Sequence, residues 1–315
     1  MTFEIPKTVY SGKIREITLG KGDKSVKVGG ETAYPFYLFE GEMPNPPKIA
    51  MEVYDSPPEE WPEAALEPFA SVTDDPVAWA KKCIDDYGAE MICLQLMSTD
   101  PNGLDRGADE AVEVVKRVAD AIDIPLIVWG CGNEEKDSEV LRKVSEVCQG
   151  KNLIIGPAEE GNHKKIGASA IGYRHTVIAS TPIDVNLAKQ LNILLGNLGV
   201  PDDSLIMDTT VSGIGYGIEY CYSVMERARM AGLTQQDEKL QFPVICNIGK
   251  EVWKAKEAHI RMEEDPKLGD ARKRGILMEA ISAMVLLLAG ADVLIMRHPE
   301  AIKLVQEMIA ELTAK

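Results

Sequence analysis

The chain has 315 residues, of which 45% are hydrophobic, and its 34 basic and 50 acidic side chains give a formal net charge of −16. This length suffices for one large domain with a sizeable core, and the negative charge argues against a surface that binds nucleic acid or an anionic membrane. No signal peptide is visible, and the six cysteines are scattered without a CxxC pair. We therefore expect a cytoplasmic protein with free thiols rather than a disulfide framework.

The first 46 residues differ from the rest and are predicted to form an N-terminal β-hairpin extension. Residues 9–19 and 25–28 have β-like composition, and residues 21–24 between them favour a turn. A proline-rich segment then marks a boundary, so we expect the extension over residues 1–46 and a second domain over residues 47–315. An interaction or a barrel-plugging role suits this extension better than chemistry does.

Eight short, nearly continuous apolar runs follow, and each is succeeded by a stretch with helical periodicity. Strands that are buried on both faces have this composition, whereas half-solvated strands alternate with polar residues. Parallel strands need a crossover helix after each strand, and eight such units can close a barrel. We therefore predict an α/β fold, a (β/α)8 TIM barrel, with strands at residues 48–54, 91–97, 125–129, 153–157, 176–179, 205–208, 243–248 and 292–296.

The helical stretches carry apolar stripes with recognisable ends. Residues 184–198 place their leucines on one stripe, and Gly199 is expected to end that helix. Pro299 is expected to open the last helix, which is predicted to bury Met308 with its other apolar residues. The most apolar window, residues 276–290, is shorter than the ~18 residues that a membrane span needs, so we predict a buried barrel helix there.

The functional face of such a barrel lies at the C-terminal ends of the strands and in the loops that follow them. These positions hold mostly amides, hydroxyls and glycines, with few groups that run acid–base chemistry. Only four histidines are present, and none has the HxH or HExxH spacing that is typical of metal sites. The mouth is therefore predicted to bind a large neutral ligand rather than to catalyse with its own side chains.

Three features of these loops leave alternatives open. Asp208, at the end of the sixth strand, could be an acid or base, or it could cap the loop that follows. The glycine-rich segment 213–217 could bind an anion or an amide oxygen at a helix start, or it could be a tight loop. Lys250 could form a Schiff base in an aldolase-like enzyme, although a lysine there is more often a loop charge.

One loop resembles a known family closely. Residues 208–220, DTTVSGIGYGIEY, are similar to a signature of the small (delta-type) subunit of the corrinoid iron–sulfur protein, the methyl carrier of the acetyl-CoA decarbonylase/synthase pathway. Residues 45–55, 75–82, 181–189 and 247–256 resemble the same family and occur in the same order. The resemblance spans essentially the whole chain.

This resemblance implies a barrel subunit that pairs with a larger subunit, which carries a [4Fe–4S] cluster and a corrinoid-binding domain. The cobalt of the corrinoid (cobalamin) would take a methyl group from methyltetrahydrofolate through a methyltransferase and deliver it to acetyl-CoA synthase, in the reductive acetyl-CoA pathway. The chain has no cysteine quartet for a cluster and no DxHxxG segment for an imidazole ligand to cobalt, in agreement with cofactors anchored on a partner.

The resemblance puts the corrinoid at the barrel mouth but assigns no single residue. Amides and hydroxyls suit the neutral amide arms of a corrin, so we predict a surface that faces the corrinoid and holds no catalytic or metal-ligating residue. The alternative is a stand-alone pterin-dependent methyltransferase barrel, in which Asp208 and Asn247 would contact the pterin. The predicted surface comprises Ser98, Thr99, Asn133, Asp208, Thr210, Gly213, Gly215 and Asn247.

Overall fold

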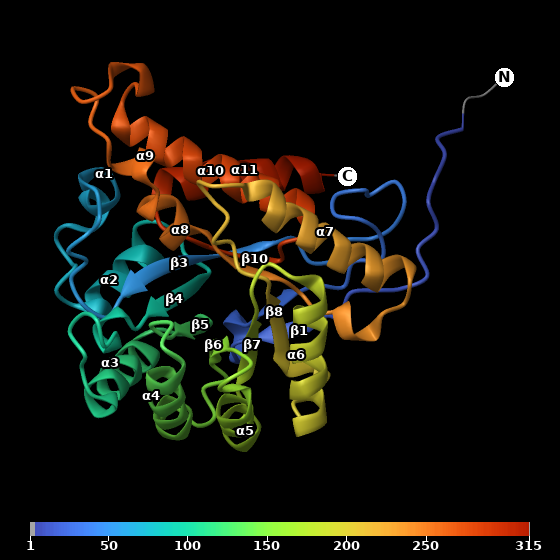
Figure 1. Ribbon diagram of the computed structural model, residues 1–315, viewed down its shortest axis with the longest axis horizontal. Helices are drawn as coiled ribbons and strands as arrows, with labels where there is room; N and C mark the ends of the chain where they lie inside the picture. The colour runs from blue at the N-terminus through green and yellow to red at the C-terminus, as the bar shows by residue number, and fades with distance from the viewer. Residues whose placement is uncertain (1–3, 315) are drawn as a thin grey trace.

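Eight parallel strands form the centre of the protein in the computed structural model, which describes residues 4–314 (Figure 1). They pair in the order β8-β7-β6-β5-β4-β3-β10-β9. An isolated bridge between Met207, in β8, and Val244, next to β9, links the first and last strands of this order. The predicted barrel is confirmed, nearly closed and within a few residues of the expected strand bounds. The strands are β3 (Lys48–Tyr54), β4 (Met91–Gln95), β5 (Leu126–Trp129), β6 (Ile154–Ala158), β7 (Thr176–Ser180), β8 (Leu205–Asp208), β9 (Ile245–Asn247) and β10 (Val293–Met296).

Helices cover the outside of this barrel. Short 3-10 helices add turns at η1 (Gly22–Lys24), η2 (Glu67–Phe69), η3 (Met97–Thr99), η4 (Asp202–Ser204), η5 (Glu238–Leu240) and η6 (Pro266–Leu268). The α-helices are α1 (Glu63–Leu66), α2 (Pro76–Asp85), α3 (Ala108–Ala121), α4 (Glu134–Val147), α5 (His163–Tyr173), α6 (Val185–Leu198), α7 (Ile218–Thr234), α8 (Ile248–Lys254), α9 (Lys256–His259), α10 (Ala271–Ala289) and α11 (Pro299–Thr313).

Local sequence signals set the ends of these helices. The Asp184 side chain accepts hydrogen bonds from the first amides of α6, and Gly199 ends that helix with φ +102°, a left-handed conformation that glycine adopts without strain. Pro299 is the first residue of α11, as predicted. Met308 was expected to be buried, but it is 37% exposed because it lies on the solvent side of α11.

The helix α10 is buried on one side only, so the prediction of a buried barrel helix over residues 276–290 is wrong in part. Its inner side packs on the barrel, with Leu286 and Leu287 fully buried. Its outer side leaves Leu277, Ile281 and Leu288 exposed by 50%, 61% and 40%. Within residues 4–314, no helix is long and apolar enough to cross a membrane.

The N-terminal hairpin closes one end of the barrel. Its strands β1 (Ile17–Leu19) and β2 (Val26–Val28) are antiparallel, and their apolar side chains join the core inside the barrel. The Asn152 side chain, next to the start of β6, donates a hydrogen bond of 2.6 Å to the Gly20 carbonyl. The first strand is shorter than the predicted 9–19, because residues before it bond to the end of α7 rather than to a partner strand. The C-terminal ends of the barrel strands lie at the opposite end.

Candidate functional site

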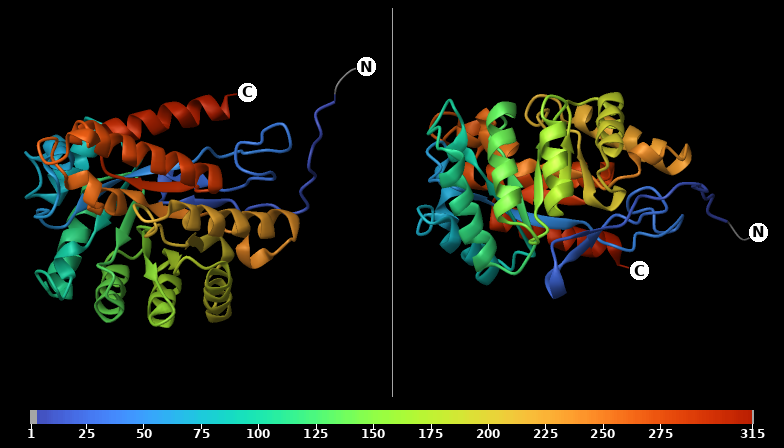
Figure 2. Two further views of the ribbon diagram at one scale, coloured as in Figure 1. Left: turned by 45° about the horizontal axis from the view of Figure 1, so that its top comes forward. Right: turned by 90° about the horizontal axis from the view of Figure 1, so that it is seen from below.

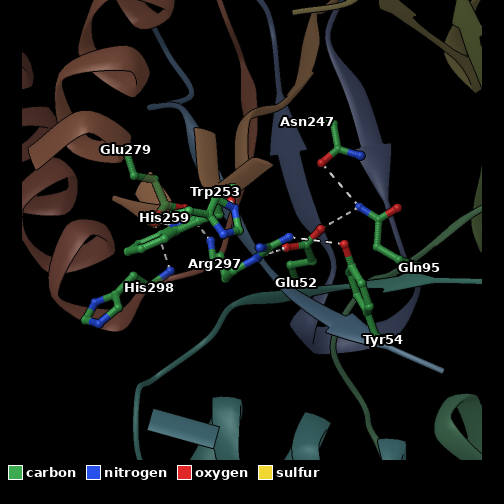
Figure 3. A network of polar contacts seen from close by, with 9 residues as sticks. All are labelled: Glu52, Tyr54, Gln95, Asn247, Trp253, His259, Glu279, Arg297 and His298. Carbon is green, nitrogen blue, oxygen red and sulfur yellow. Dashed lines mark hydrogen bonds and ion pairs between the residues drawn. The ribbon is translucent and has the colours of Figure 1, made fainter. Parts of the chain in front are cut away.

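A buried polar network lies at the C-terminal ends of four barrel strands (Figure 3). Gln95, from β4, donates hydrogen bonds from Nε2 to Glu52 Oε1 at 3.0 Å and to Asn247 Oδ1 at 3.2 Å. Glu52 and Gln95 are fully buried, and Asn247 is 7% exposed. The closure of the barrel thus brings the predicted residue Asn247 next to two side chains that the sequence analysis missed.

Arg297 ties this network to the barrel rim. Its Nε donates to Glu52 Oε2 at 2.6 Å, and a terminal guanidinium nitrogen donates to the Tyr54 hydroxyl at 3.1 Å. The guanidinium carbon also lies 3.7 Å from the centre of the Trp61 ring, a cation–π contact. Both ions are buried, so removal of either one would leave the other as an unpaired charge whose desolvation is no longer compensated. The pair therefore fixes the two strand ends relative to each other.

Glu279, from α10, holds the segment that carries Arg297. Its carboxylate accepts hydrogen bonds from the backbone amides of Arg297 and His298 and from Nε1 of Trp253, the last at 2.7 Å. Burial raises the pKa of Glu279 to about 7, although these donors favour the ionised form. A carboxyl group from the outer helix layer thus positions two residues that line the mouth.

A cleft of about 660 Å³ opens beside this network at the barrel mouth. The cleft has a size that suits a drug-sized ligand or part of a larger one. Lys250, the candidate Schiff-base lysine, lies in its wall on α8. The wall also contains Tyr54, Trp61, Met97, Trp253 and Arg297.

Asp208 occupies the other side of the mouth, at the end of β8. Its carboxylate accepts hydrogen bonds from Ser180 Oγ at 2.7 Å and from the Thr210 amide at 2.9 Å, so it caps the loop that follows. Burial raises the pKa of Asp208 to about 6. Burial also raises the pKa of Glu159 to about 7, with the Glu134 carboxylate as the next cause. Two carboxyl groups on this side can therefore exchange protons close to neutral pH.

The predicted residues of the β4 and β5 loops have structural hydrogen bonds of their own. The Ser98 amide and hydroxyl both donate to Asp55, and Thr99 Oγ1 donates to the Leu96 carbonyl at 2.8 Å. Both residues are almost fully buried. Asn133 is exposed and caps α4 by accepting from the Lys136 amide at 3.0 Å. Of these three predicted residues, Asn133 alone presents its side chain to solvent.

The loop after β8 contains the other predicted residues. Thr210 and Gly215 have φ values of +49° and +87°, so both adopt the left-handed conformation that a tight loop requires. A Cβ on Gly213 would lie 2.8 Å from the Gly217 carbonyl oxygen, so this position needs a glycine for close packing. Tyr216 at the tip of the loop is 93% exposed. All eight predicted residues lie at one end of the barrel, in separate hydrogen-bonded groups.

The mouth was expected to hold few groups that run acid–base chemistry, but buried carboxylates and Arg297 line its base. One signal was available: Glu52 and Gln95 interrupt strands that are otherwise apolar and buried on both faces. A polar residue in such a strand requires a buried partner. The identity of that partner could not be read from the sequence, because Glu52 and Arg297 are 245 positions apart.

Comparison with known proteins identifies the family. Residues 16–313 match the family described as CO dehydrogenase/acetyl-CoA synthase delta subunit. The chain belongs to this family. It is 38% identical to the acetyl-CoA decarbonylase/synthase complex subunit delta of Archaeoglobus fulgidus, over 99% of this chain and 71% of that protein. It is 34% identical to the subunit of the same name from Methanocaldococcus jannaschii, over 100% of this chain and 78% of that one. The predicted family is confirmed.

Solved structures similar to this delta subunit family member include dihydropteroate synthases. The enzyme from Xanthomonas albilineans in complex with 7,8-dihydropteroate has a TM-score of 0.56 at 14% identity, over 90% of this chain and all of that one. The enzyme from Stenotrophomonas maltophilia has a TM-score of 0.54 at 13% identity, over 85% of this chain and 94% of that one. At this level of identity the similarity supports the barrel fold alone.

Proposed function

We propose that this chain is the small subunit of a corrinoid-dependent methyl carrier and that its barrel mouth holds part of the corrinoid. The observation that carries the proposal is the family match over residues 16–313, since the relatives are subunits of the acetyl-CoA decarbonylase/synthase complex. A larger subunit with a [4Fe–4S] cluster would hold the rest of the cofactor. A methyltetrahydrofolate methyltransferase and acetyl-CoA synthase would be the methyl donor and acceptor partners.

The residues at the mouth fit such a ligand. A corrinoid is larger than ligands that clefts of this size usually enclose, so the cleft of about 660 Å³ would cover one part of it and leave the rest to a partner. The exposed Asn133 side chain and the backbone of the β8–α7 loop offer neutral hydrogen-bonding groups, as amide arms require. Gln95 Oε1 is buried at the base of the mouth without a hydrogen-bond partner in residues 4–314.

The protein's own contribution would be to bind, orient and exclude water. A bound corrinoid would supply the cobalt that accepts and gives up the methyl group. The Glu52–Arg297 pair would keep the base of the mouth rigid, and Trp61 and Trp253 would shield the cleft from solvent. The amide arms at the rim would contact Asn133, Thr210, Gly213 and Gly215. Asp208, bonded to Ser180, would hold that loop in place.

The test uses Asn133→Asp in the chain co-expressed with the larger corrinoid subunit of the same genome. This change keeps the oxygen that caps α4 but removes the Nδ2 donor that could meet an amide arm. We expect the complex to retain less corrinoid during dialysis, as measured by its visible absorbance. Asn197→Asp, at an exposed position near the end of α6, is the matched control and should have no effect. Equal retention by both variants would contradict a corrinoid contact at Asn133.

A second function, a stand-alone pterin-dependent methyltransferase, is favoured by one observation. Glu52, Gln95 and Asn247 place a carboxylate beside two amides at the base of the mouth, a donor and acceptor set that suits the aminopyrimidinone edge of a pterin. Isothermal titration of the isolated chain with methyltetrahydrofolate separates the two functions. Micromolar binding that Asn247→Ala and Asp208→Ala abolish would favour the methyltransferase, and no binding would leave the subunit proposal.

A further inference from the structure

The outer face of α10 has no charged side chain from Gly275 to the end of the helix. The exposed or half-exposed residues there are leucine, isoleucine, methionine, valine and one serine, and they cover about three turns. Ile281, in the middle of this face, is 61% exposed. The only ionisable residue of this stretch, Glu279, points inward and is fully buried. Figure 2 shows α10 beside α11 on the outside of the barrel, and the 50%, 61% and 40% exposure of Leu277, Ile281 and Leu288 leaves this face open to solvent among the described residues 4–314.

Two other outer helices of the same barrel, α3 and α4, differ. The outer sides of α3 and α4 carry ion pairs such as Lys143 with Asp109, at 2.9 Å, which keep those faces in water. Soluble proteins rarely leave a contiguous apolar helix face exposed unless another molecule packs on it. The apolar outer face of α10 therefore differs from the charged outer faces of α3 and α4.

An exposed lysine, Lys273, lies at one end of this face. Lys273 is four residues before Leu277 and eight before Ile281, so the three lie on one stripe of the helix. Its neighbour Arg272 is already paired with Glu67 and Glu300, whereas Lys273 forms no ion pair within the described residues 4–314. The stripe consists of Lys273, Leu277, Ile281, Met284 and Leu288, and we call it the α10 stripe.

We infer that the α10 stripe is a docking surface for an apolar helix of a different subunit, which brings a carboxylate to Lys273. The inference rests on the proposed function, because it takes that subunit to be the larger corrinoid subunit. Apolar ridges of two helices interdigitate, and an opposite charge at the end of the contact would set the register. The surface lies on the outside of the barrel and is separate from the mouth, where the cofactor would be shared.

A second copy of this chain fits the α10 stripe less well. In a two-fold contact the same patch meets itself, and the exposed side of α10 contains no carboxylate that could pair with Lys273. Two copies would also bring together two chains that each carry a net charge of −16. Both considerations favour a partner with an acidic group beside an apolar face and with less net negative charge.

The test compares two isoleucine-to-lysine variants of the full chain. Ile281→Lys places a charge in the middle of the α10 stripe, and Ile171→Lys is the matched control at a 38% exposed position on α5. We expect Ile281→Lys to weaken binding of the purified larger subunit by a factor on the order of thirty, measured by biolayer interferometry. Lys273→Glu should weaken it by about fivefold. Ile171→Lys should bind like the wild type, and all variants should melt at the wild-type temperature.

The outcomes separate this inference from the proposed function. If the wild type forms a complex with a corrinoid spectrum and Ile281→Lys binds as tightly, the docking surface is refuted while the proposed function stands. If the isolated wild type is a dimer by light scattering, and Ile281→Lys makes it a monomer that still binds the larger subunit, the occupant is a second copy and the inference is also refuted. If the wild type does not bind the larger subunit, both proposals fail.

Discussion

Replacing Arg297 with methionine tests whether the buried ion pair organises the barrel mouth. The change removes the 2.6 Å contact with Glu52, the hydrogen bond to Tyr54 and the cation–π contact with Trp61. Glu52 is fully buried, so its carboxylate would lose its cationic partner without gaining solvent. Breaking a buried pair in this way costs about 3–5 kcal/mol, so we expect the free energy of unfolding to fall by about 4 kcal/mol.

The double variant Glu52→Gln/Arg297→Met shows whether this cost comes from the unpaired charge. A glutamine at position 52 can still bond to Gln95, and neither charge of the Glu52–Arg297 pair remains. We therefore expect the double variant to lose only about 1–2 kcal/mol, less than either single variant. Urea unfolding at pH 7, followed by circular dichroism, measures all four proteins. If the losses of the two single variants add in the double variant, the pair is not coupled and the reasoning is refuted.

Three further predictions concern the carboxyl groups and the hairpin. Because burial raises the pKa of Asp208 from 3.8 to about 6, the native state keeps a proton that the unfolded state releases, so this group makes stability fall by about 2 kcal/mol from pH 4 to 6. Urea unfolding of Asp208→Asn at several pH values should show a smaller fall in stability between pH 4 and 6. An unchanged pH dependence would exclude Asp208 as its source. Glu134→Gln should lower the pKa of Glu159 in a carbon-13 NMR titration, and an unmoved midpoint would exclude Glu134 as a cause of the raised pKa. Ile17→Ala should cost about 2–5 kcal/mol in thermal unfolding, because it opens a cavity inside the barrel, whereas the 91% exposed Val9→Ala should cost nothing measurable.

Much of the fold could be predicted because local patterns determine it. Continuous apolar runs specify strands that are buried on both faces. Capping residues such as Asp184 and Gly199 set the ends of a helix through local hydrogen bonds and backbone conformation, whatever the helix packs against. The hairpin was predictable as a hairpin, but the length of its first strand was not. That length depends on residues near position 12, whose amides bond to Leu233, more than 200 positions away.

The candidate site was predictable in position but only partly in content. Strand ends define the mouth, so the eight predicted residues lie there, including Asn247 beside Gln95. The Glu52–Arg297 pair was missed because strands from opposite ends of the chain become neighbours only when the barrel closes. Helical periodicity alone also misjudged α10, since an apolar outer face such as that around Ile281 looks in sequence like a face that the chain itself buries.

The visible absorbance spectrum of the chain co-purified with its larger subunit tests the central claim most directly. Each chain should also be purified alone under the same anaerobic conditions. Our account predicts a complex with a corrinoid spectrum that neither isolated chain retains in full, because the barrel mouth covers part of the cofactor. A larger subunit that keeps all of its corrinoid without this chain, and that elutes separately from it at micromolar concentration, would contradict the account.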